Sequence, residues 1–250
     1  AGRAGGADYA FSTNDSLPPG HLITLAAPFF YGDPTRPDRE SRFWETSTGF
    51  HEICGYAGIV SLLFWLLGFL PIPPHGGNDE ERFARREFHF FTAVAVGAVF
   101  FALGRYNPLY GLLYYGLPGW KYFRVPGRLL LLFILGVSTG AARGLAAGLA
   151  ADWKQAAASW PVKAGAALSA LFAIVTLITA GSRPAILAGL REFEIDRTVM
   201  AYNLWTARRV DISRQLPERL FEIRYDWMLH SLLVACALLA AGWLSLYLAR

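Results

Sequence analysis

The sequence predicts an all-α fold, a polytopic bundle of transmembrane helices. Of its 250 residues, 54% are hydrophobic and only 17% are charged, whereas a soluble domain usually carries about a quarter charged residues. Five apolar segments also approach the length that crosses a bilayer, roughly 20 residues. Backbone polar groups in lipid must be paired within their own segment, so we expect these five segments to be helices.

Prolines, glycines and charged residues separate the five expected spans. Pro71 ends the first span and Gly104-Arg105 ends the second, while Arg128 precedes the third. The spans are predicted at residues 53–70, 88–103, 129–149, 162–180 and 228–248.

These spans divide the chain into four parts. Residues 1–52 are expected to form an external loop, in which the apolar but short stretch 21–31 makes an interfacial or re-entrant helix. Residues 53–181 would be a four-helix transmembrane core containing a second re-entrant or interfacial segment at 105–127, rich in aromatics and bounded by prolines. Residues 182–227 would form an amphipathic external loop and 228–250 the last span. The chain opens without methionine or a leader pattern, so we expect a piece whose N-terminal part is missing.

Glycine recurs every four residues in the third span. This spacing places the glycines on one helical face, where a second helix can approach closely. The residues are Gly136, Gly140, Gly144 and Gly148.

A pair of arginines precedes the third span. The run Lys121-Tyr-Phe-Arg-Val-Pro-Gly-Arg128 sets Arg124 and Arg128 four apart, with Pro126 between them. Arginine is costly near hydrocarbon, and its planar fork matches phosphate oxygens, so an anionic ligand is one interpretation. The alternative is that both side chains anchor the helix at the headgroup level.

Five further residues near the predicted membrane surface are candidate ligand contacts. His51 and Glu52 lie at the mouth of the first span and Tyr56 one turn later. Glu52 could interact with the positive end of the helix, pair with an arginine, or hold a basic ligand group or a metal. Arg105 and Tyr106 follow the second span, where the helix C-terminus also favours a cation.

Other classes of site are not indicated. The basic residues, which give a net charge of +4, are scattered, so no nucleic-acid partner is expected. The histidines lack metal-ligand spacing, and Cys54 and Cys236 are expected to be small buried apolar residues. No cofactor is predicted, and a divalent metal is not indicated.

Several motifs, taken in order, resemble the bacterial YfhO family of membrane proteins. They are Ser16-Leu-Pro-Pro-x-His-Leu-Ile-Thr-Leu-x-x-Pro28-Phe-Phe-Tyr-Gly32, then Phe50-x-Glu52-x-x-x-Tyr56-x-Gly58, Leu103-Gly-Arg-Tyr-Asn-Pro-Leu-Tyr110 and Pro118-x-x-x-x-Phe123-Arg124-x-Pro126-x-Arg128. The resemblance covers roughly residues 10–150 and fades to hydropathy beyond them.

The family is similar to C-type (GT-C) glycosyltransferases. The resemblance implies a multi-pass enzyme of the bacterial cytoplasmic membrane that moves a sugar from a polyprenyl-phosphate carrier to a cell-envelope acceptor. The catalytic carboxylate would precede this chain, and the Arg124/Arg128 end would face outward.

The resemblance also implies roles for individual residues. Arg124 and Arg128, with Arg105, would grip the lipid phosphate, while Tyr106, Tyr110 and Trp120 would line the entrance. Glu52 would orient an arginine or contact the acceptor. A transporter or flippase of a lipid-linked intermediate and a non-catalytic scaffold are the alternatives.

Overall fold

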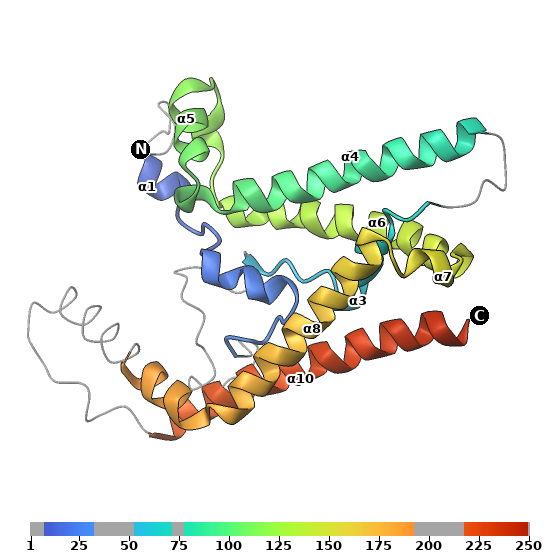
Figure 1. Ribbon diagram of the computed structural model, residues 1–250. Helices are drawn as coiled ribbons and strands as arrows, with labels where there is room; N and C mark the ends of the chain where they lie inside the picture. Colours follow the sequence, from blue (N-terminus) through green and yellow to red (C-terminus); the bar gives the residue numbers. More distant parts are fainter. Residues whose placement is uncertain (1–7, 33–52, 72–77, 193–217, 250) are drawn as a thin grey trace, which may run out of the picture.

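The computed structural model describes residues 8–32, 53–71, 78–192 and 218–249, and every regular element in them is a helix (Figure 1). Most of these helices are α-helices, and short 3-10 helices connect them. The elements are α1 (Tyr9–Ser12), η1 (Pro19–Leu25), α3 (Ile59–Leu67), α4 (Asn78–Ala102), η3 (Gly104–Tyr106), α5 (Pro108–Gly116), η4 (Trp120–Tyr122), η5 (Pro126–Leu129), α6 (Leu130–Ala150), α7 (Trp153–Ala156), α8 (Trp160–Gly181) and α10 (Glu218–Leu248). The all-helical prediction is therefore confirmed for the described residues.

Three helical segments are long and apolar enough to cross a membrane. They are Pro126–Ala150, Trp160–Gly181 and Phe221–Leu248, and they match the third, fourth and fifth predicted spans. A span of 22 residues, the shortest of the three, is about 33 Å long at 1.5 Å per residue, enough for a hydrocarbon core of roughly 30 Å.

The first predicted span differs from its expected form. Only Ile59–Leu67 is helical within residues 54–70, a helix of nine residues. Gly58 precedes this helix with a φ of +93°, which is incompatible with an α-helix. The helix therefore cannot extend back past Gly58. The chain therefore enters the core in a non-helical form at residues 54–58 and turns into α3 at this glycine.

The second predicted span lies within the longer helix α4. The N-terminal half of this 25-residue helix is charged and includes Glu81, Arg82, Arg85 and Arg86. Its apolar part, residues 88–102, is about 15 residues and roughly 22 Å long, short of the hydrocarbon thickness. The structure thus supports three candidate spans among the described residues and does not confirm five.

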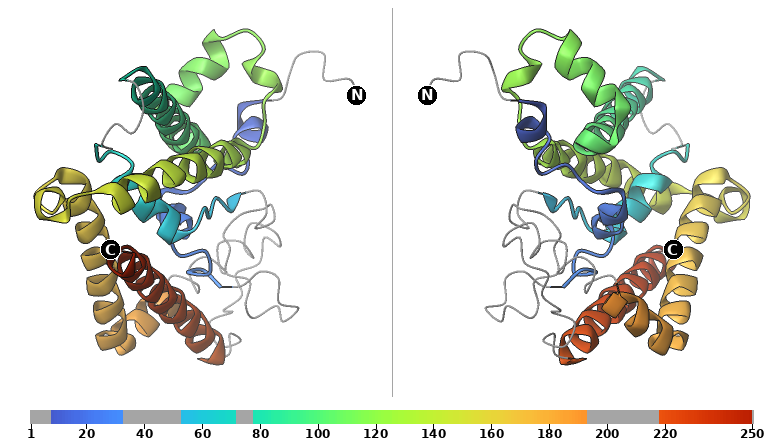
Figure 2. Two further views of the ribbon diagram at one scale, coloured as in Figure 1. Left: turned by 90° about the vertical axis from the view of Figure 1, so that its right-hand side faces the viewer. Right: turned by 90° about the vertical axis from the view of Figure 1, so that its left-hand side faces the viewer.

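Helix α3 lies at the centre of the bundle. It packs against α6 on one side and against α8 and α10 on the other, and α4 lies along α6 (Figure 1). Two further views show the pair α4 and α6 in one half and the pair α8 and α10 in the other (Figure 2). The fully buried Ile59 and Leu63 of α3 meet Phe172 of α8 and Leu232 of α10 in the core.

The predicted glycine face of α6 is confirmed. All four glycines are buried, and each faces a neighbouring helix. A Cβ at Gly136 would meet the Phe91 carbonyl oxygen of α4, and one at Gly144 would overlap the Phe64 carbonyl oxygen of α3. Helix α6 therefore touches the backbones of α3 and α4 directly.

Two predicted surface segments take other forms. The stretch 21–31 contributes to the 3-10 helix η1, with His21, Thr24 and Leu25 buried. In the predicted amphipathic loop 182–227, residues 183–192 are helical and residues 218–227 belong to α10, whereas residues 193–217 lie outside the described part of the chain.

Candidate functional site

Three segments distant in sequence meet where α4 ends and α6 begins. The Leu17 N–H donates to the Ala102 carbonyl (2.8 Å) and the Gly127 N–H donates to the Asp15 carbonyl (3.1 Å). The Arg105 N–H donates to Ser16 Oγ (3.0 Å). We call this contact of residues 15–17, 104–105 and 125–127 the junction.

Gly104 lets the three segments approach. Its φ of +46° lies in the left-handed region, and a Cβ there would overlap Ser16 and press on the Pro126 ring. A larger residue would therefore separate the segment around Ser16 from the turn around Pro126.

Val125 makes the junction's turn in a strained backbone conformation. Its φ of 60° and ψ of 69° are left-handed, which is a clear outlier for a β-branched residue. Its side chain is nevertheless buried, and Pro126 follows it directly. Such conformations cost about 1–3 kcal/mol and persist only where surrounding contacts fix them; here the bond from Gly127 to Asp15 is one such contact.

The two predicted phosphate ligands lie on either side of this turn. Arg124 precedes Val125, and Arg128 lies in η5 at the start of the α6 span. Both arginines are exposed. The Arg124 guanidinium carbon lies 5.6 Å from the Phe11 ring centroid, a cation–π contact with α1.

Arg105 has a structural partner. Its Nε and Nη2 atoms both donate to the Thr13 carbonyl, at 3.1 and 2.9 Å. Ser16 Oγ donates to the same carbonyl at 2.7 Å. The structure thus ties Arg105, and the turn that carries Arg124 and Arg128, to one short segment, residues 11–16. A phosphate contact of Arg105 stays a prediction.

The remaining predicted site residues are not part of the junction. Tyr106 follows Arg105 and is 50% exposed. Tyr56 is half-buried in the non-helical segment before α3. His51 and Glu52 lie outside the described residues, so their proposed pairing with an arginine stays a prediction.

Residues 104–123, which we call the α5 segment, project from the bundle beside α1 (Figure 1). Their exposed side chains are largely apolar or aromatic: Tyr106, Leu109, Leu112, Tyr115, Leu117, Tyr122 and Phe123. Such a surface fits the headgroup region, where tyrosine side chains are favoured. The ring of Tyr110 is buried against Trp120, at 5.8 Å between centroids, and burial raises the pKa of this phenol. Tyr110 therefore packs inside the α5 segment, and its role at an entrance stays a prediction.

An apolar groove starts beside the junction. Its volume is about 340 Å³. Leu103, the lining residue that follows α4, immediately precedes Gly104 and Arg105. The lining residues come from α3, α4, the residue after α4, and α6: Trp65, Ala95, Val96, Val99, Phe100, Leu103 and Phe133. Val96 is 56% exposed, so the groove opens sideways from the bundle.

Arg224 is a buried cation that the sequence analysis did not select. It lies in the first turns of α10 with 3% exposure, and its guanidinium carbon is 5.9 Å from the Tyr31 ring. The buried His21 ring stacks on Tyr31 at 4.3 Å. An arginine just before an apolar run usually indicates a headgroup anchor, so the sequence carried no signal of this burial.

Comparisons with known proteins return no relative. No protein-family model, no curated protein and no solved structure matches the chain. The resemblance to the YfhO family therefore stays a prediction. Among the described residues, no group of three or more His, Cys, Asp or Glu side chains could hold a metal ion.

Proposed function

We propose that the chain is part of a bacterial membrane glycosyltransferase of the C type, which moves a sugar from a polyprenyl-phosphate donor to a cell-envelope acceptor. One observation carries the proposal. Two exposed arginines, Arg124 and Arg128, flank a fixed turn at the start of a candidate span, and an apolar groove begins beside that turn.

This arrangement fits an amphiphilic anion with a long apolar tail. The guanidinium groups would meet the phosphate, since their donors match its oxygens. The isoprenoid chain would lie along α4 and α6 in the groove from Leu103 towards Phe133. The aromatic α5 segment would rest in the headgroup region above the same leaflet.

The five-span topology belongs to this proposal. Helices α3 and α4 would each cross the bilayer together with adjacent residues. The chain would then pass five times, with the junction outside the cytoplasmic membrane and α7 inside. The antiparallel order of α4, α6, α8 and α10 supports this path (Figure 1).

In the reaction, the acceptor oxygen would attack the anomeric carbon as the bond from that carbon to the phosphate oxygen breaks. The acceptor proton would pass to the carboxylate that the family resemblance places before this chain. Negative charge builds on the departing phosphate, and Arg124 and Arg128 would stabilise it because they are already in position.

The test is turnover of a radiolabelled polyprenyl-phosphate sugar by the full-length protein in membranes. The double variant Arg124→Ala/Arg128→Ala should lower turnover by about 100-fold or more, the typical effect of removing a preorganised charge contact. Arg86→Ala is the matched control, since Arg86 is exposed on the charged half of α4 and should leave turnover unchanged.

The other outcomes separate the alternatives. Binding of the lipid without turnover by the wild type would favour a transporter or flippase. Unchanged turnover in the double variant would leave the arginines as membrane anchors and remove the phosphate role.

A further inference from the structure

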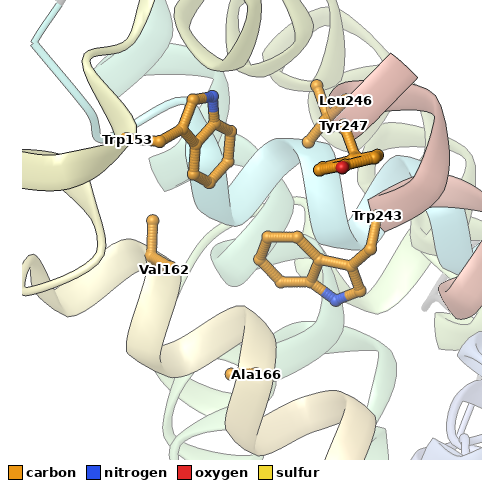
Figure 3. A pocket seen from close by; sticks show the side chains of 6 residues that line it. All are labelled: Trp153, Val162, Ala166, Trp243, Leu246 and Tyr247. Atoms are coloured by element: carbon orange, nitrogen blue, oxygen red, sulfur yellow. The ribbon is translucent and has the colours of Figure 1, made fainter. Parts of the chain in front are cut away.

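At the end of the bundle opposite the junction, a hollow of about 360 Å³ lies between α7, α8 and α10 (Figure 3). None of the residues that line it takes part in the proposed function. Its lining is aromatic and aliphatic, from Trp153, Val162, Ala166, Trp243, Leu246 and Tyr247.

The polar atoms of the two indoles are already used. The Trp153 N–H donates to the Gly148 carbonyl and the Trp243 N–H to Ser169 Oγ, each at 3.1 Å. The two rings contact each other edge to face, with centroids 6.2 Å apart. The indoles therefore present carbon atoms to the hollow, which suits a hydrocarbon chain.

The location of the hollow indicates a lipid. Two of its walls are the candidate spans Trp160–Gly181 and Phe221–Leu248, and it lies where α8 begins and α10 ends. Trp160 and Tyr247 at this level are 57% and 66% exposed, as is typical of aromatic residues at a membrane surface. An acyl chain of the surrounding leaflet can enter such a hollow directly.

The charges beside the hollow favour an anionic headgroup. Lys154 follows the lining residue Trp153, Lys163 follows Val162, and both lysines are exposed. The carboxylate of Asp152 accepts a bond from the Lys154 backbone N–H (3.0 Å) and caps α7. Each lysine near an anionic leaflet contributes favourably to lipid binding.

We propose that this hollow, with Lys154 and Lys163 beside it, binds one acyl chain of an anionic phospholipid and retains that lipid with the protein. The site is independent of the proposed transferase activity, since it lies at the other end of the bundle.

The test uses native mass spectrometry of the protein released from nanodiscs of phosphatidylglycerol and phosphatidylcholine. The wild type should retain one phosphatidylglycerol. Ala166→Phe fills the hollow and should lower that retained fraction at least about fivefold. Ala167→Phe is the control, because Ala167 is exposed on the same helix but does not line the hollow.

A second variant tests the headgroup. Lys154→Gln/Lys163→Gln should reduce the preference for phosphatidylglycerol over phosphatidylcholine while a lipid is still retained. Equal retention of phosphatidylglycerol by the wild type and Ala166→Phe would overturn the site, and equal retention of both lipids by the wild type would overturn the anionic assignment. Thermal unfolding of each variant checks that its fold is intact, and a dimer that displaces the lipid would assign the hollow to a second copy of the chain.

Discussion

Arg143 of α6 and Glu81 of α4 form an ion pair, with 3.0 Å between Nη2 and Oε1. The arginine side chain is only 9% exposed and the glutamate 28%. Nε of the same arginine donates to the Gly68 carbonyl at the end of α3 (3.1 Å), and the guanidinium lies 5.7 Å from the Phe88 ring. One cation therefore joins three helices at the end opposite the junction.

Replacing Glu81 by Gln should destabilise the protein. The Arg143 guanidinium would keep its place but lose its counter-charge in a poorly hydrated site. Glutamine keeps an acceptor oxygen but not the charge, so the expected loss is about 1 kcal/mol, the difference between a hydrogen bond with and without a charged acceptor. The measurement is the free energy of unfolding in detergent. Arg82→Gln is the control, because its pair with Asp79 is long (3.8 Å) and exposed, and such pairs contribute little. If the two variants lowered the free energy of unfolding equally, the buried pair would contribute no more to stability than the exposed pair.

Replacing Gly144 by Ala should also destabilise the protein, by about 1–3 kcal/mol, the usual cost of overpacking. The new methyl group would overlap the Phe64 carbonyl oxygen and force α3 and α6 apart. Gly97 is the matched control, because a Cβ at that position has nothing within 4 Å. Gly97→Ala should therefore leave stability unchanged or raise it by about 0.5–1 kcal/mol through helix propensity. The measurement is thermal unfolding of the two variants in the same detergent. If Gly97→Ala lowered stability as much as Gly144→Ala, the close contact between α6 and α3 would be ruled out as the cause.

Arg105→Ala should lower stability where Arg124→Ala does not. The first variant loses both bonds to the Thr13 carbonyl, a change of roughly 1 kcal/mol for an exposed charged donor. The second loses an exposed ring contact. Thermal unfolding of both variants would show the difference, and Arg105→Lys should recover only part of the loss because lysine lacks the planar fork. If Arg105→Ala left stability unchanged but abolished donor binding, Arg105 would be a ligand contact and not a positioning residue.

Ser16→Ala should weaken the junction by about 1–3 kcal/mol. The buried Ser16 hydroxyl accepts from the Arg105 N–H and donates to the Thr13 carbonyl. Its removal leaves the Arg105 N–H without this acceptor in a partly buried site. Proteolysis near residues 104–128 in the native state would report the local loosening. The comparison is Ser169→Ala, away from the junction. This variant should leave the rate of proteolysis at residues 104–128 unchanged.

The candidate spans were predictable because their signals are local. Pro126–Ala150 and Trp160–Gly181 carry long apolar runs, and the glycine face of α6 follows from a repeat every four residues. In both cases the residues that decide the structure lie within the element itself.

The entry into α3 was not predicted, because hydropathy treats glycine as an ordinary weakly apolar residue. The pair Gly55 and Gly58 was a usable signal, and Gly58 does adopt a left-handed conformation. The charged half of α4 lies before the predicted second span, residues 88–103, although Asn78 already begins the helix.

The junction was beyond sequence reasoning for a different reason. Arg105 and Thr13 are 92 residues apart, and no local pattern indicates that they meet. The same holds for Arg143 and Glu81, which are 62 residues apart. A single sequence shows which arginines flank a span but not which backbone carbonyl each one reaches.

The backbone contact along the glycine face of α6 determines how this protein can move. Helices α3, α4 and α6 meet without an intervening layer of side chains at Gly136 and Gly144, so they should shift together as a rigid body. Helices α8 and α10 meet α3 through larger side chains such as Phe172 and Leu239, which can change rotamer. We therefore expect any opening and closing to occur between these two groups of helices, while the turn that carries Arg124 and Arg128 keeps its position relative to α4.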